Sequence, residues 1–496
     1  MIKRRAELLL ASIAFCLLTM LNLVLADESS SKRALRNDLV EKGQFIHIPG
    51  PNPIIKPGPE GSWDEICTEA SDAFKDFGTY YLYYHGFGKR MNYATQQGTG
   101  YQLGVATSTH PLGPFKKYEG NPILKVGPKG SWEDITVACA MVLKEGTDKY
   151  YMWYSAKSSL TEQGVFGIGL ATASNPLGPW KKYEGNPILE DFGYVGGVVN
   201  ANGKYYLYTA YPIGSTGVDY SPMSLAISDT PQGPWTKYSG NPVIRQGEWG
   251  EWDDGGFSEA EVLYHSGVFH LFYGGTKLYA PRRLSRESIG YAYSFDGYNW
   301  VKYGLNPVVT REACPNLACF AEVHAIFESP FIYLYHTIRY KGPLRQGQGD
   351  TYDGYKVDLK SYLYEDLGVQ VLVTRRPFSL DMPLLNLASL DAGTTTALTD
   401  SPPINLSYIT RLALTAKCTY GSKATKPIRL RVRSSHDGYN YDTSDLYTLD
   451  NVLKQGQTVQ RTFELDSKVR FIKVMVENLD DSESVSDVQI TATLGG

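Results

Sequence analysis

Acidic and imidazole side chains recur at matching places in three segments of the chain, and they are the residues best suited to acid–base chemistry. We align the segments on a pair of apolar residues that precedes a tight turn, such as Ala73-Phe74, and compare the residues just before that pair. The residue before the pair is acidic or His in these segments, and in two of them a Glu lies two positions further back. Residues two apart share a strand face, so we predict that all five converge. They are Asp72, Glu259, Glu261, Glu322 and His324.

Carboxyl groups that converge in an interior are costly to desolvate unless they have partners or a task. Hydrolysis of a glycosidic bond is such a task, because it needs one protonated and one ionised carboxyl group, and clustered charges split their pKa values. We predict Asp72 as base or nucleophile and either Glu259 or Glu261 as general acid. Glu322 and His324 would tune that acid or hold a sugar hydroxyl. Alternatively, the acids form salt bridges or bind a channel cation such as calcium; no cofactor is otherwise required.

A second set of polar residues near the same strand ends is expected to bind substrate. Glu69 would join the catalytic group if its strand carries a bulge, because Thr68-Glu69-Ala70 mirrors Ser258-Glu259-Ala260. Two further acids belong to a motif, Trp followed by two acidic residues, that recurs in three units; for such a motif we favour loop capping. The basic members are the candidates for a phosphate pocket. The set comprises Glu69, His85, Asp134, Lys157, Asp254, Lys277, His336 and Arg339.

The elements that must position these residues come from a repeat. Asn-Pro followed by two branched apolar residues occurs five times, beginning at positions 52, 121, 186, 241 and 306. Self-similarity of this kind is typical of stacked or radial units. Each unit has the pattern of four short strands, rich in Tyr, Val and Ile and separated by Gly-Pro and Asp-Gly turns. Five such units predict a five-bladed β-propeller, closed by a degenerate copy of the repeat at residues 377–384.

Loop lengths predict which face of the propeller carries the functional site. Connections between the first and second strands of a unit are tight, whereas four connections between the second and third strands are long, at residues 86–100, 211–222, 274–287 and 339–354. Long loops in a compact fold are usually functional. They share a face with the start of each innermost strand, so we expect a pocket at that mouth of the channel.

The composition changes to small, polar residues after the last repeat. We therefore predict an all-β protein with a propeller catalytic domain at 44–386, a linker at 387–403 and a β-sandwich at 404–496. In the sandwich, residues 435–441 echo residues 294–300, and we interpret both as Asp-Gly turns. Carbohydrate binding by the sandwich and simple packing against the propeller are both left open.

The first residues have the pattern of a secretory signal peptide. Basic residues precede an apolar run from Leu8 to Ala26, so we predict a leader at 1–26 followed by a polar segment at 27–43, with an uncleaved anchor as the alternative. The protein would then be secreted or periplasmic, with no integral membrane domain after cleavage. Five cysteines would remain, of which Cys314 and Cys319 are near enough in sequence to bridge. The net charge of −4 gives no basic footprint for nucleic acid.

Several of these motifs together resemble a known superfamily. The five-unit order, the Trp-acid-acid entry to the inner strand, Tyr-Tyr-Leu-Tyr-Tyr on the second strand and Ser-Phe-Asp-Gly-Tyr-Asn-Trp are similar to the five-bladed propeller glycoside hydrolases, which include families 43, 32, 68 and 117. The resemblance covers about residues 44–385. Family 43 enzymes typically carry an Asp base on blade one, a second Asp on blade two and a Glu acid on blade three. Here Asp72 matches the first, but Tyr194-Val195-Gly196-Gly197 offers no acid on blade three.

The resemblance implies hydrolysis of an oligo- or polysaccharide, with the acid moved to Glu259 or Glu261 on blade four. Two alternatives stay open. One is a carbohydrate-binding propeller without catalysis, which pairing of the acids with arginines would favour. The other is a phosphorylase or transglycosidase, which would need Lys157, Lys277 or Arg339 around a phosphate. The sequence does not specify an oligomeric state.

Overall fold

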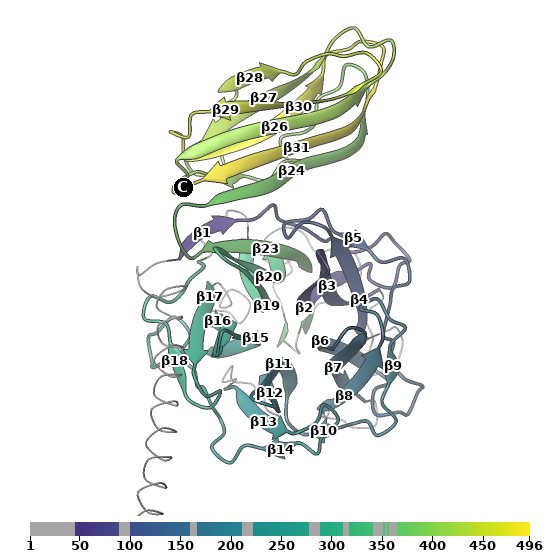
Figure 1. Cartoon of the computed structure of the whole chain (residues 1–496), viewed down its shortest axis with the longest axis vertical. Coiled ribbons are helices and arrows are strands. Elements are labelled where there is room, and N and C mark those ends of the chain that lie inside the picture. Colours follow the sequence, from purple (N-terminus) through teal and green to yellow (C-terminus); the bar gives the residue numbers. More distant parts are fainter. Residues whose placement is uncertain are drawn as a thin grey trace, which may run out of the picture.

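The computed structural model describes residues 45–88, 100–158, 166–210, 222–276, 288–310, 317–340, 351–352, 355–356 and 365–496. Every regular element within these ranges is a strand, which confirms the all-β prediction (Figure 1). None of the described residues belongs to a helix of the length and apolarity needed to cross a membrane. The leader expected at 1–26, the polar segment at 27–43 and Cys314 lie outside the described ranges.

Strands that follow one another in the chain form four antiparallel sets of four, which we call units one to four, with the first strand of each set innermost (Figure 1). Unit one contains β2 (Cys67–Asp76), β3 (Thr79–Phe87), β4 (Gln102–Ser108) and β5 (Lys116–Lys117). Unit two contains β6 (Thr136–Glu145), β7 (Lys149–Lys157), β8 (Phe166–Ala173) and β9 (Lys181–Lys182), with β10 (Leu189–Glu190) also paired to β8. Unit three contains β11 (Tyr194–Ala201), β12 (Lys204–Ala210), β13 (Ser224–Ser228) and β14 (Thr236–Lys237). Unit four contains β15 (Gly256–His265), β16 (Val268–Thr276), β17 (Ser288–Ser294) and β18 (Trp300–Lys302).

Unit five takes its outermost strand from the beginning of the chain. Its order from the inside is β19 (Leu317–Glu328), β20 (Phe331–Tyr340), β23 (Glu365–Val373) and β1 (Ile46–Pro49). The short strands β21 (Thr351–Tyr352) and β22 (Tyr355–Lys356) pair with each other. The inner strands contact one another in the order β2, β6, β11, β15, β19 and back to β2, which makes a closed ring.

The Asn of the repeated phrase fixes the third strand of each unit. In units one to four its side-chain Oδ1 accepts the N–H of a third-strand residue, and its Nδ2 donates to the carbonyl oxygen of the same residue. Asn52 accepts the N–H of Val369 on β23 in unit five at 2.6 Å. The first copy of the repeat therefore serves the last unit. The four complete pairs are Asn121 with Val105, Asn186 with Leu170, Asn241 with Leu225, and Asn306 with Tyr291.

Apolar side chains pack between neighbouring units rather than in one central core. Tyr83 and Val105 of unit one, for example, share a cluster with Val142 and Tyr154 of unit two. Further clusters join units two and three, three and four, and four and five. A single cluster joins units five and one and continues into the C-terminal sheets. Burial between units thus holds the ring together.

Two four-stranded sheets face each other at the C-terminus (Figure 1). Along β26, buried residues alternate with partly exposed ones, and apolar residues of both sheets belong to one cluster. One sheet has the order β24 (Ser379–Leu390), β31 (Val485–Gly495), β26 (Arg411–Tyr420) and β29 (Thr458–Leu465). The other has the order β25 (Ile404–Asn405), β30 (Phe471–Asn478), β27 (Ile428–Ser435) and β28 (Tyr447–Asp450).

The pairing of β24 corrects two boundaries predicted from the sequence. The repeat pattern predicts that residues 377–384 close the last unit, and the composition predicts a linker at residues 387–403. Instead β24 runs along β31 from the Ser379–Gly495 pair to the Leu390–Val485 pair, so residues 379–390 belong to the C-terminal sheets. An alternating apolar strand looks the same in sequence whether it ends one sheet or begins the next.

Candidate functional site

The starts of the inner strands lie beside the ends of the second strands. Cys67 pairs with Phe87 in unit one, and Gly256 pairs with Thr276 in unit four. The long connections between second and third strands begin at this edge, which we call the loop face. Glu69 and the predicted catalytic residues lie on the inner strands, between this loop face and the opposite end of each strand.

Three of the five predicted catalytic side chains meet at the centre of the ring. Asp72 on β2, Glu261 on β15 and His324 on β19 each offer one ligand atom, and these atoms lie within 4.8 Å of one another. Each residue pairs with the fifth residue of the following strand, so the three occupy the same level. Their exposed fractions are 2%, 2% and 4%. The structure therefore brings these three side chains together, and we call them the central triad.

Backbone donors hold the two carboxyl groups of the central triad. Asp72 accepts the N–H of Ala73 at 2.8 Å and that of Val142 on β6 at 2.6 Å, and Glu261 accepts the N–H of Ala325 on β19. Their nearest carboxyl oxygens lie within 4.8 Å of each other. Burial raises the pKa of Asp72 to about 7. Burial and then the charge of Asp72 raise the pKa of Glu261 well above its usual range.

His324 is the remaining member of the central triad. Its ring lies near the backbone of Ala70, but neither ring nitrogen makes a hydrogen bond of normal geometry to a described residue. Burial, followed by the nearby His85, lowers the pKa of His324 to about 3. The imidazole is therefore neutral at physiological pH, with a lone pair available to a proton donor or a cation.

A second polar cluster lies nearer the loop face of unit one. Glu69 pairs across the ladder with His85, whose Nε2 lies 2.9 Å from Glu69 Oε2. Tyr101 donates its hydroxyl to Glu69 Oε1 at 2.7 Å, and Ser71 Oγ lies 2.8 Å from His85 Nδ1. Glu69 and His85, expected to bind substrate, are thus the centre of a buried network. Sequence reasoning missed Tyr101 and Ser71 because neither lies in either predicted register row.

A bulge explains why Glu322, another predicted catalytic acid, does not join the central triad. Every inner strand has a register shift just upstream of the triad level, for example between Ala70 and Asp72 and between Ala321 and His324. Glu322 lies inside such a bulge with a φ of 45°, so it no longer shares the face of His324. Glu259 lies in the corresponding bulge of unit four, and its side chain is outside the described part.

The Trp-acid-acid motif is structural in the three units that carry it. Its first acid accepts a Lys ammonium and a Tyr hydroxyl, as Asp253 does from Lys302 at 2.6 Å and from Tyr273 at 3.2 Å. Its second acid accepts the N–H of a turn glycine: Gly130 donates to Asp134 at 2.7 Å, and Gly250 to Asp254 at 2.9 Å. These contacts support loop capping, rather than substrate binding, for Asp134 and Asp254.

Of the other predicted binding residues, the structure describes the side chains of His336 and Lys157. His336 is fully buried on β20, where its Nε2 lies 3.0 Å from Gln370 Nε2 and its Nδ1 lies 3.0 Å from the carbonyl oxygen of Thr337. Lys157 ends β7 and is half-buried. Lys277 and the side chain of Arg339 lie outside the described part. His336 is therefore part of the unit-five framework rather than of the central triad.

Comparisons with known proteins show structural likeness. No protein-family model matches the chain, and no curated protein matches its sequence. The chain is similar to Zg3597, a family 117 glycoside hydrolase produced by the marine bacterium Zobellia galactanivorans, at 18% identity over 67% of this chain and 90% of that one, with a TM-score of 0.43. It is also similar to a thermostable family-43 glycoside hydrolase, at 18% identity over 66% and 93%, with a TM-score of 0.41. A third structure, a glycosyl hydrolase from Bacteroides ovatus, has 16% identity over 67% and 95% and a TM-score of 0.46. Families 43 and 117 are both among those that the sequence motifs resemble.

Proposed function

We propose that this chain is a carbohydrate-active enzyme, a glycoside hydrolase whose ring is a five-bladed β-propeller followed by a β-sandwich. The closed order of five inner strands supports the propeller. The two facing C-terminal sheets support the sandwich. The observation that carries the function is the presence of three buried carboxyl groups, Asp72, Glu261 and Glu69, in two different environments at the centre of the ring.

Asp72 and Glu261 are suited to hold a proton. Two buried carboxyl groups this close repel each other when both are ionised, so one of them is readily held protonated. Burial and then the charge of Asp72 raise the pKa of Glu261 well above its usual range, so Glu261 is the group that keeps the proton near neutral pH. A carboxyl group in this state can act as general acid on a leaving sugar oxygen. Glu261 therefore fits proton donation, with the carboxyl group of Asp72 beside it.

Glu69 is suited to the second task. Tyr101 donates to one of its oxygens and His85 contacts the other, and accepting on both oxygens is the hydrogen-bonding role of an ionised carboxylate. In that role Glu69 would act on water or on the anomeric carbon. Glycoside hydrolysis needs one carboxyl group of each kind.

The short distance between Asp72 and Glu261 argues against these two acting alone on opposite sides of a bond. Carboxyl groups that flank a glycosidic bond are about 5–5.5 Å apart in retaining enzymes and about 6.5–9.5 Å apart in inverting ones. The nearest oxygens of Asp72 and Glu261 lie within 4.8 Å of each other, which is closer than either separation. A third carboxyl group is required, and Glu69 is the described candidate nearest to the loop face of unit one.

The central triad also supports a second candidate role, a cation site that stabilises the channel. The observation that favours it is His324, whose ring nitrogens have no normal hydrogen bond to a described residue beside two carboxyl groups. One imidazole and two carboxylates suit Zn²⁺ or Mn²⁺, whereas calcium prefers an all-oxygen shell. Metal analysis of the purified protein distinguishes the roles. Stoichiometric metal that is lost in His324→Ala would assign the triad to cation binding and contradict shared-proton catalysis.

The catalytic proposal is tested by release of reducing sugar from arabinan, xylan, agarose and polygalacturonan, followed by variants on the substrate that is cleaved. Asp72→Asn, Glu261→Gln and Glu69→Gln should each fold and lose on the order of 10³-fold or more in kcat. Glu60→Gln, an exposed acid of unit one, is the matched control and should keep wild-type turnover. No release from any of the four polysaccharides, or wild-type turnover in Glu69→Gln and Asp72→Asn, would contradict the proposal.

A further inference from the structure

Three turns on the loop face have the same pattern of backbone hydrogen bonds and carry different residues at the exposed position before their last glycine. Each turn precedes an inner strand, in units one, two and four, and leads into the Trp-acid-acid motif. In each, a glycine N–H donates to the carbonyl oxygen of the motif's first acid, at 3.0, 3.0 and 3.2 Å. The last turn glycine has a φ of 84°, 86° or 92° and donates its N–H to the motif's second acid. The residue just before that glycine is Glu60, Lys129 or Trp249.

Because the backbone hydrogen bonds are the same, the turn itself does not require Trp249. Glu60 and Lys129 occupy the equivalent position in the other two turns, and both are exposed, as charged residues usually are. Trp249 is 69% exposed, so most of a large apolar side chain faces water.

A flat, exposed indole at the mouth of a carbohydrate-active ring has a chemical use. Sugar rings present faces of C–H groups that pack against aromatic rings, while their hydroxyls stay in water. Trp is amphipathic and has few rotatable bonds, so it provides contact area at low entropic cost. We infer that Trp249 is a stacking platform for one sugar ring of an extended oligo- or polysaccharide, on the unit-four rim of the loop face.

This inference rests on the proposed function and deepens it. Glu261 lies five residues along β15 from Gly256, roughly 15 Å at the usual rise of a strand, and Trp249 precedes that strand. A subsite at Trp249 is therefore useful only to a chain of several sugars. The substrate class is therefore an extended glycan rather than a monosaccharide glycoside.

The other two turns supply the test variants. Trp249→Lys and Trp249→Glu place on the unit-four turn the residues that the same turn accepts elsewhere, so folding should be kept, as an unchanged Tm would verify. Their charges are opposite, so a loss shared by both must come from the missing ring. Affinity electrophoresis through gels that contain arabinan, xylan, agarose or polygalacturonan measures binding. Lys129→Trp, which adds an exposed ring in another unit, is the control for nonspecific stickiness.

We expect at least one polysaccharide to retard the wild-type protein. Both charged variants should bind it on the order of 10-fold more weakly, and Trp249→Phe should keep most of the affinity. No retardation by any of the four polymers, or equal retardation of wild type and both charged variants, would overturn the inference. Retardation that depends on Trp249 without sugar release would instead contradict only the proposed hydrolysis. Sugar release with normal binding by the variants would contradict only the subsite.

Discussion

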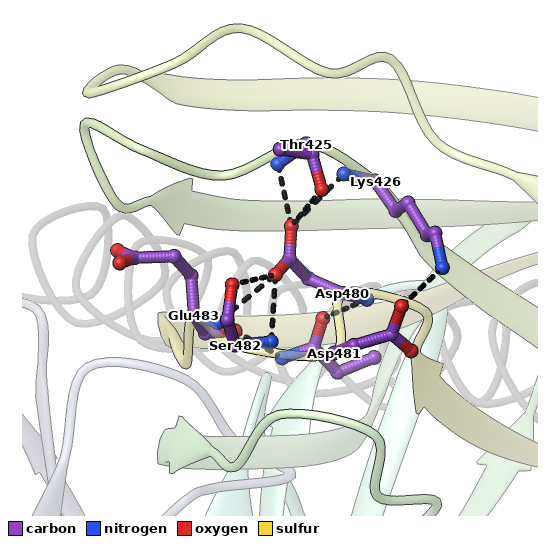
Figure 2. Close-up of polar contacts among 7 residues, drawn as sticks. Thr425, Lys426, Asp480, Asp481, Ser482 and Glu483 are labelled. Atoms are coloured by element: carbon purple, nitrogen blue, oxygen red, sulfur yellow. Dashed lines mark hydrogen bonds and ion pairs between the residues drawn. The ribbon is translucent and has the colours of Figure 1, made fainter.

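Asp480 and Asp481 are adjacent acids in the loop between β30 and β31, and only the first is enclosed by donors (Figure 2). One oxygen of Asp480 accepts the N–H groups of Thr425 and Lys426 and the Thr425 hydroxyl. The other accepts the N–H groups of Ser482 and Glu483 and the Ser482 hydroxyl. These hydrogen bonds, first among them that of the Thr425 N–H, lower the pKa of Asp480 far below its usual range. Asp481 meets only the Lys426 ammonium at 2.5 Å and is 79% exposed.

The contrast predicts unequal effects of the same substitution. Asp480→Ala should lower the Tm by several degrees, because it leaves backbone donors of two loops without their acceptor. Asp481→Ala, the matched control, should change the Tm little, as exposed ion pairs contribute little. Differential scanning calorimetry of both variants at pH 7 checks this. Equal Tm values would show that Asp480 does not hold the loops together.

Residues of the central triad could be predicted from sequence because their positions are counted from the hairpin. No bulge lies between the hairpin and Asp72, Glu261 or His324, so the count holds in every unit. Further upstream it fails, because the bulges add residues that strict alternation does not anticipate. The face on which Glu69 lies depends on a bulge in its strand, and β2 has such a bulge between Ala70 and Asp72. The partners of Glu69, such as Tyr101, come from other strands and could not be read from a single-strand pattern.

At the scale of elements, the units differ in how a lysine of the fourth strand is used. In unit four, Lys302 on β18 reaches the buried carboxylate of Asp253, which is 1% exposed. In unit three, which lacks the Trp-acid-acid motif, Lys237 on β14 donates instead to the carbonyl oxygens of Glu190 and Asp191. The same position in the repeat thus holds either a charge pair or a backbone contact.

This difference predicts the cost of removing each ammonium. Lys302→Met should reduce the free energy of unfolding by about 1–3 kcal/mol, because the charge of Asp253 loses its cation in a buried place. Lys237→Met should cost less, since exposed carbonyl oxygens can turn to water. Guanidinium denaturation of both variants measures the two values. A larger loss in Lys237→Met would contradict the role given to the Trp-acid-acid motif.

The repeat itself is predicted from the recurring Asn-Pro phrase, and the structure shows why the phrase recurs: its Asn pins a third strand. What the pattern could not decide was which end of the chain completes the last unit. Residues 46–49 and 379–384 both have strand-like sequences, and either could lie beside β23. In the structure β1 pairs with β23, so residues 46–49 form the outermost strand of unit five.

At the scale of the whole molecule, a chain of neutral side chains links β1 to the rest of unit five. His47 on β1 lies 2.8 Å from Gln370 Oε1 on β23, and Gln370 Nε2 lies 3.0 Å from His336 on β20. Burial lowers the pKa of His336 to about 4. The unfolded chain has the ordinary value of about 6.5, so it binds a proton more readily than the folded protein between these two pH values.

Stability should therefore decline as the pH falls from about 6.5 towards about 4. Replacing His336 by Gln should remove part of this decline, whereas His436→Gln, at a side chain that is 90% exposed, should leave it unchanged. Urea unfolding midpoints at pH 7 and pH 4.5 provide the measurement. An identical pH dependence in wild type and His336→Gln would exclude this linkage.

The position of β1 also fixes the order in which the protein can be completed. The ribosome makes β1 before every other described strand, yet the strand that receives it, β23, is made about 300 residues later. Units one to four are each built from one continuous stretch and can pair their strands as they emerge, whereas β1 must wait with its edge unpaired. Strand β1 is thus made early and placed late, and a ribosome stalled before residue 365 would hold the inner strands β2 to β19 but no β23 to receive β1.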